Sequence, residues 1–190
     1  EDYMKSGLLD RAETVFTELA AIDQRAPQAL RHLIDIFQSE RDWNSAIDNA
    51  QRFEEVTGTP MGELIAMFEC ELAERHRAAG DIEAARAAIT RAYAADSNAV
   101  RPGMLEGRIE AVAGNHAAAI KAFERAARHD PDYLPEILPV LLESYEKVGD
   151  LAGAKRFLTE MTEHYRGVAP VLALTRLTER EEGVHAARQY

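Results

Sequence analysis

The stretch GNHAAAIKAFERAARHDP, from Gly114 to Pro131, decides the fold of this chain. Behind its opening glycine, alanines and the larger Ile120 and Phe123 recur at spacings of three and four, which places them on one stripe of a helix. We expect the helix to stop at Asp130, because the residue before a proline is pushed out of the α region. The stretch therefore predicts a glycine turn followed by a helix with one buried face.

The same pattern recurs with a period of about 34 residues. The string GDIEAARAAITRAYAADS begins at Gly80, 34 residues before Gly114. Turn residues stand at Gly7, Arg41-Asp42, Gly80-Asp81, Gly114-Asn115 and Gly149-Asp150, and an alanine follows each by five positions, at Ala12, Ala46, Ala85, Ala119 and Ala154. We expect a proline to open the first helix of each pair, at Pro27, Pro60, Pro102, Pro135 and Pro170. This period indicates stacked helical hairpins rather than extended strands.

The second repeat departs from the pattern. A larger apolar residue usually follows the alanine by four positions, but in this repeat Ala50 stands there. We expect Trp43 and Phe53 to fill the space, although Trp43 could instead be an exposed interface aromatic. Residues 57–62, TGTPMG, predict a loop inserted between two units.

Composition sets limits on what the chain binds. The 190 residues carry a net charge of −11 and are 46% apolar. This charge disfavours binding to nucleic acid or anionic lipid, because phosphate contacts need a basic face. No apolar run approaches the roughly 18 residues that span a bilayer, and no signal peptide is recognisable. Because helical periodicity is already running at Tyr3 and the first residue is Glu1, we expect a soluble piece of a longer protein.

The repeat resembles the tetratricopeptide repeat (TPR). Residues 100–133 match best, through Gly107, Gly114, Ala119, Phe123, Ala126 and Pro131, and depart at Gly103 and Glu106, where a large aromatic residue and a leucine are usual. The resemblance implies an all-α fold, a TPR-type α-solenoid of helix–turn–helix repeats in a right-handed superhelix. We expect full repeats at 27–60, 66–99, 100–133 and 135–168, and partial repeats at 1–25 and 169–190, in one continuous solenoid.

Longer strings resemble one particular TPR family, lipopolysaccharide assembly protein B, also called LapB or YciM. They are DYMKSGLLDRAETVF (Asp2–Phe16), WNSAIDNAQRF (Trp43–Phe53), FECELAERH (Phe68–His76) and AADSNAVRP…LEGR (Ala94–Arg108). They follow the family's order with similar gaps, and the resemblance weakens after Asp130.

This resemblance implies a place and a role for the parent protein. Family members have one N-terminal anchor in the bacterial inner membrane and hold their repeats on the cytoplasmic side. A rubredoxin-like domain that binds iron or zinc through four cysteines closes the family's chain, whereas this sequence has a single cysteine. The family restrains lipopolysaccharide synthesis by promoting degradation of the deacetylase LpxC by the membrane protease FtsH.

In TPR arrays the first helices of the pairs form the binding surface. Aligning the repeats predicts that this surface includes Arg31, Asp35, Gln38, Met67, Glu74, Arg77, Arg101, Met104, Arg108, Glu143 and Lys147. Four of these residues are arginines, which form bidentate pairs with carboxylates and are common at binding hot spots. We expect a groove for an acidic segment of a partner. The alternative is that each arginine pairs with a nearby glutamate of its own chain.

No motif favours catalysis or a resident cofactor. The six histidines form neither HxxxH nor HExxH, and no GxSxG, GxGxxG or P-loop pattern occurs. Cys70 is the only cysteine, and on a helix it is more typical of a small buried residue than of a nucleophile. We therefore expect no enzyme activity, catalytic residue or metal site in this chain.

The leading hypothesis is a non-enzymatic adaptor that holds LpxC and FtsH together. One rival is a general TPR peptide-binding or assembly scaffold, of the co-chaperone, pilus or secretion type. A second rival is an enzyme, which would need a closed pocket. A third is a structural role through homodimers, since terminal repeats expose apolar faces.

Overall fold

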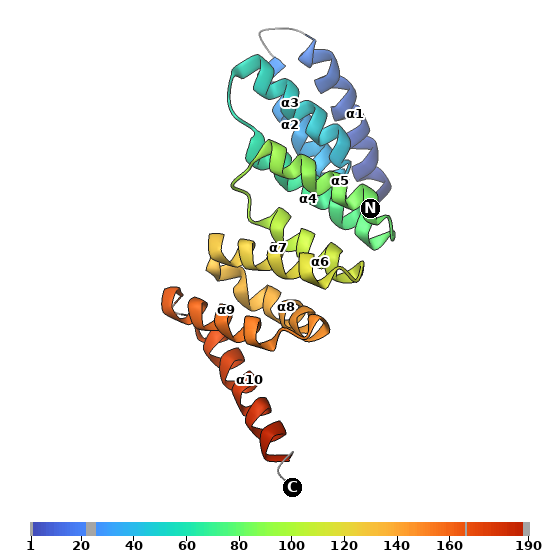
Figure 1. The fold of residues 1–190 in the computed structure, drawn as a ribbon. Coiled ribbons are helices and arrows are strands. Elements are labelled where there is room, and N and C mark those ends of the chain that lie inside the picture. Colours follow the sequence, from blue (N-terminus) through green and yellow to red (C-terminus); the bar gives the residue numbers. More distant parts are fainter. Residues whose placement is uncertain (1, 22–25, 166, 188–190) are drawn as a thin grey trace. The chain divides into compact units, whose positions relative to one another are not determined.

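In the described part of the chain, every secondary-structure element is a helix. The computed structural model describes the chain except residues 1, 22–25, 166 and 188–190 (Figure 1). The helices are α1 (Asp2–Ala20), α2 (Ala26–Glu40), α3 (Trp43–Thr57), α4 (Gly62–Ala78), α5 (Ile82–Ala95), α6 (Arg101–Val112), α7 (His116–His129), the short 3₁₀ helix η1 (Pro131–Tyr133), α8 (Leu134–Val148), α9 (Leu151–His164) and α10 (Val168–Ala187). The predicted all-α fold of helical hairpins is confirmed.

The chain divides into two compact units, residues 1–102 and 103–190. In the first unit, α2 packs against α3 and α4 packs against α5, while α1 lies along α2. In the second unit, α7 packs against α8, and α9 packs against both α8 and α10. Figure 1 shows each of these packed pairs as neighbouring ribbons. In each unit, helices that follow one another in the sequence therefore pack side by side.

A left-handed residue followed by a capping residue makes the turns inside the hairpins. Gly80, Gly114 and Gly149 have φ near +80°, where a residue without a side chain is favoured, and Arg41 takes the same region at φ 58°. The next residue is the N-cap of the following helix, which begins one position later. Asp42, Asp81 and Asp150 each accept a hydrogen bond from the backbone N–H three residues on, at 3.3, 3.1 and 2.8 Å. These four turns lie where the sequence predicts them.

The turn expected at Gly7 is wrong, because Gly7 lies inside α1. At the other four positions the residue after the turn is Asp or Asn, which can cap a helix, whereas Leu8 follows Gly7. A glycine without a following cap does not end the helix here.

Small side chains allow the two helices of each hairpin to approach closely. Ala46, Ala85, Ala119 and Ala154 are all fully buried, as the repeat predicts. In the third full hairpin, a Cβ added to Gly107 on α6 would lie 2.5 Å from the ring of Phe123 on α7. The glycine therefore holds α6 against a fully buried phenylalanine.

Most of the predicted prolines lie where a helix begins. Four of the predicted prolines lie in the first turn of a first helix, at Pro27, Pro102, Pro135 and Pro170. Pro60 instead lies in the loop before α4, within the predicted insertion.

Trp43 is half-buried and stacks on Phe68 of α4, with ring centroids 5.7 Å apart. It thus packs the α2–α3 hairpin against α4.

Candidate protein-binding surface

The residues expected on the first helices divide between the two units. We call them the first-helix surface. In the first unit, Arg31, Asp35 and Gln38 are exposed on α2, whereas Met67, Glu74 and Arg77 are half-buried on α4 and Arg101 is exposed at the start of α6. In the second unit, Arg108 is half-buried on α6, and Glu143 and Lys147 are exposed on α8. All of these side chains are accessible to a partner at least in part.

Met104 is the exception, and its assignment to the exposed surface is wrong. Only 4% of Met104 is exposed, because it lies with Leu105 and Ile109 among the buried apolar residues of α6. Cys70, which shares a helix face with Met67 in sequence, is also fully buried. Helical spacing places residues on one face but does not show how deeply that face sinks into its neighbours.

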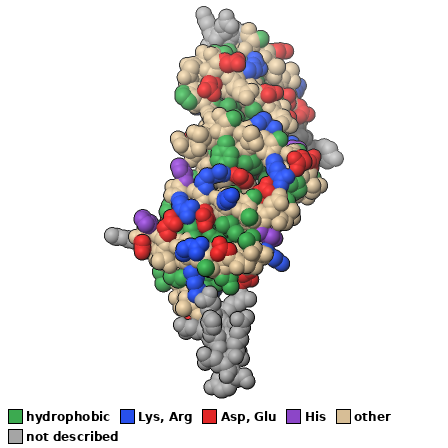
Figure 2. Space-filling view, in the orientation of Figure 1, with side chains coloured by type: hydrophobic (Ala, Val, Ile, Leu, Met, Phe, Trp, Pro, Cys, Tyr) green, Lys and Arg blue, Asp and Glu red, His purple; other side chains and the backbone are tan. Residues whose placement is uncertain are grey.

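Each of the four arginines already contacts another residue of its own unit. The guanidinium of Arg31 lies 5.0 Å from the ring centroid of Phe53, in the geometry of a cation–π contact. Arg77 donates two hydrogen bonds to Glu74, at 2.9 and 2.6 Å, and this pairing raises the pKa of Arg77 above its ordinary value. Figure 2 shows Lys and Arg side chains lying beside Asp and Glu on the visible face.

The other two arginines pair with glutamates that are distant in the sequence. Arg101 donates to Glu71 of α4 in the first unit, and Arg108 donates to Glu136 of α8 at 2.6 Å in the second unit. Three of the four arginines thus pair with glutamate, as the alternative reading of the sequence expects. Partly exposed pairs of this kind are worth about 0–1 kcal/mol, so a carboxylate from a partner can replace the internal one at little cost.

An ion pair between a buried carboxylate and a partly exposed arginine, which the sequence did not predict, links α4 to α5. Glu69 is 5% exposed and accepts a hydrogen bond of 2.7 Å from the Nε of Arg91. Its other carboxylate oxygen is buried without a hydrogen-bond partner among the described residues. The only sequence signal is the position of Glu69 between two buried residues, Phe68 and Cys70. The pair stabilises the hairpin that presents Met67, Glu74 and Arg77.

Cys70 is suited to packing rather than to chemistry. Burial raises the pKa of its thiol to about 12, and the nearby Arg101 offsets this only in part. We expect iodoacetamide to leave Cys70 almost unmodified between pH 7.5 and 9.5 while the chain is folded, because the thiolate is the reactive form. In urea the same thiol should react at the rate of a free cysteine peptide. Mass spectrometry of the alkylated chain measures both rates, and rapid labelling with intact helical circular dichroism would contradict the assignment.

The described residues contain no group of three or more His, Cys, Asp or Glu side chains arranged to hold a metal ion. Nor does any helix in the described ranges combine the length and apolar character needed to cross a membrane.

Comparison with known proteins agrees with the resemblance seen in the sequence. A family model described as tetratricopeptide repeat matches residues 70–133. Lipopolysaccharide assembly protein B of Escherichia coli strain K12 is 33% identical over 189 residues, which cover 100% of this chain and 49% of that protein. The protein of the same name from Haemophilus influenzae is 27% identical over 187 residues, covering 98% of this chain and 47% of that protein.

This chain is similar along its full length to part of lipopolysaccharide assembly protein B. It spans about half the length of the LapB proteins it matches. A thermophilic TPR protein of Thermus thermophilus matches over 93% of this chain and 94% of its own, at 19% identity and a TM-score of 0.42. A likeness at that level adds nothing to the relationship with LapB.

Proposed function

We propose that this chain is the protein-binding part of a non-enzymatic adaptor that regulates lipopolysaccharide synthesis at the inner membrane. The adaptor holds the deacetylase LpxC close to the protease FtsH, and the two partners supply all the catalysis. The observation that carries this proposal is the similarity to LapB across the full length of the chain. The parent protein has a membrane anchor and a metal-binding domain outside these residues, with the repeats on the cytoplasmic side.

The physical contribution of such an adaptor is effective concentration. When one scaffold binds both an enzyme and a protease, their encounter becomes intramolecular, which raises the local concentration to about the millimolar range for short connections. Helical repeats suit this role, because neighbouring hairpins present separate side-chain sets to separate partners. The first-helix surface is the part of the chain that we assign to partner binding.

Charge reversal on the first-helix surface tests the assignment. We expect the double variant Arg101→Glu/Arg108→Glu to bind purified LpxC, or the cytoplasmic part of FtsH, at least about tenfold more weakly. Each substitution removes a cation that a partner carboxylate would use and places like charges beside Glu71 or Glu136. Isothermal titration calorimetry measures the dissociation constants.

The matched control is Arg86→Glu/Arg125→Glu. These two arginines also pair with glutamates, Glu83 and Glu106, but they lie on the second helices α5 and α7. The control should bind both partners within about twofold of the unmodified chain. If the two double variants bind equally well and their helical circular dichroism is unchanged, then the first-helix surface does not bind these partners. Full affinity for one short peptide of either partner would instead favour a general peptide-binding module.

A further inference from the structure

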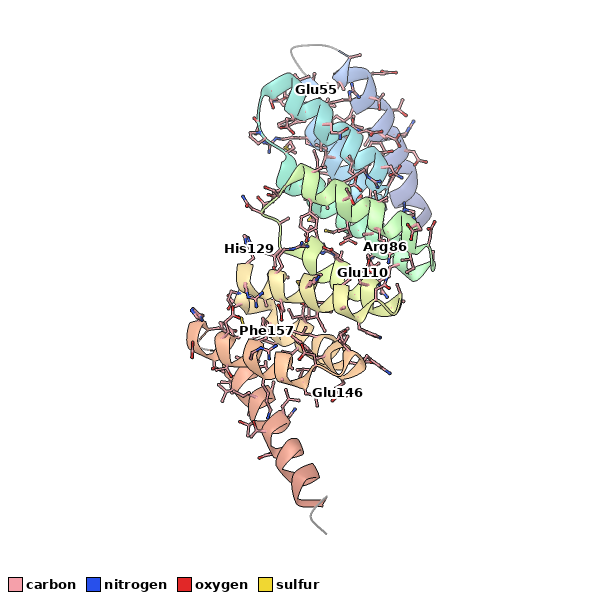
Figure 3. All side chains as sticks on the ribbon, viewed as in Figure 1. Glu55, Arg86, Glu110, His129, Glu146 and Phe157 are labelled. Carbon is pink, nitrogen blue, oxygen red and sulfur yellow. The ribbon has the colours of Figure 1, made fainter. Side chains whose placement is uncertain are left out.

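We draw no further inference here: the strongest candidate, the hollow of about 520 Å³ between α7 and α9 beside Phe157 (Figure 3), is lined by three cations and three carboxylates, so nothing in the structure shows which kind of partner would occupy it.

Discussion

Replacing Phe123 with alanine will lower the free energy of unfolding by about 3–5 kcal/mol. The ring is fully buried on α7 and lies against Gly107 of α6, so the substitution removes apolar contacts from the core. The substitution leaves a cavity between α6 and α7, and the glycine opposite has no side chain to fill it. Urea denaturation followed by circular dichroism in the far ultraviolet measures the change.

Two further variants locate this effect at the contact between Gly107 and Phe123. Val112→Ala, at a valine that is 64% exposed on α6, should cost less than about 0.5 kcal/mol. Gly107→Ala should destabilise the unmodified chain, because its Cβ meets the Phe123 ring at 2.5 Å, but it should cost less in the Phe123→Ala background. A loss below about 1 kcal/mol for Phe123→Ala would show that the two helices do not depend on this ring.

Replacing Arg91 with leucine should cost about 1–3 kcal/mol of stability. Glu69 is almost fully buried and its only described hydrogen bond comes from Arg91, so the variant leaves a buried carboxylate without a partner. Because Arg91 itself is 53% exposed, water can reach part of the pair and holds the effect below that of a fully buried ion pair. Thermal and urea unfolding both report the change.

The double variant Glu69→Leu/Arg91→Leu separates the pair from the packing around it. We expect it to be more stable than Arg91→Leu alone, since an apolar residue replaces the unpaired charge. The control Arg86→Leu, whose partner Glu83 is 83% exposed, should change stability by less than about 1 kcal/mol. If Arg91→Leu and Arg86→Leu are equally mild, then Glu69 does not depend on Arg91.

Local chemistry made the helices and their turns predictable from the sequence. A left-handed glycine followed by Asp or Asn ends one helix and begins the next, and this pair of residues recurs at Gly80, Gly114 and Gly149. Asn115 shows that the signal tolerates variation, because its side chain donates to Glu110 at 2.8 Å instead of capping α7. Gly7 lacks the following cap and lies inside a helix.

The contacts between helices were not predictable, because they depend on register rather than on local pattern. The pairs Arg101–Glu71 and Arg108–Glu136 join residues 30 and 28 positions apart, which no local spacing pattern relates. The burial of Met104 has the same origin.

The lifetime of LpxC in cells tests the adaptor account most directly. In a Gram-negative strain whose own LapB is depleted, the full-length parent of this chain is supplied either unmodified or with Arg101→Glu/Arg108→Glu. Immunoblots then follow LpxC after protein synthesis is stopped. The account predicts rapid loss of LpxC with the unmodified protein and a clearly longer lifetime with the double variant at equal adaptor level. Equal lifetimes with the two proteins would contradict it.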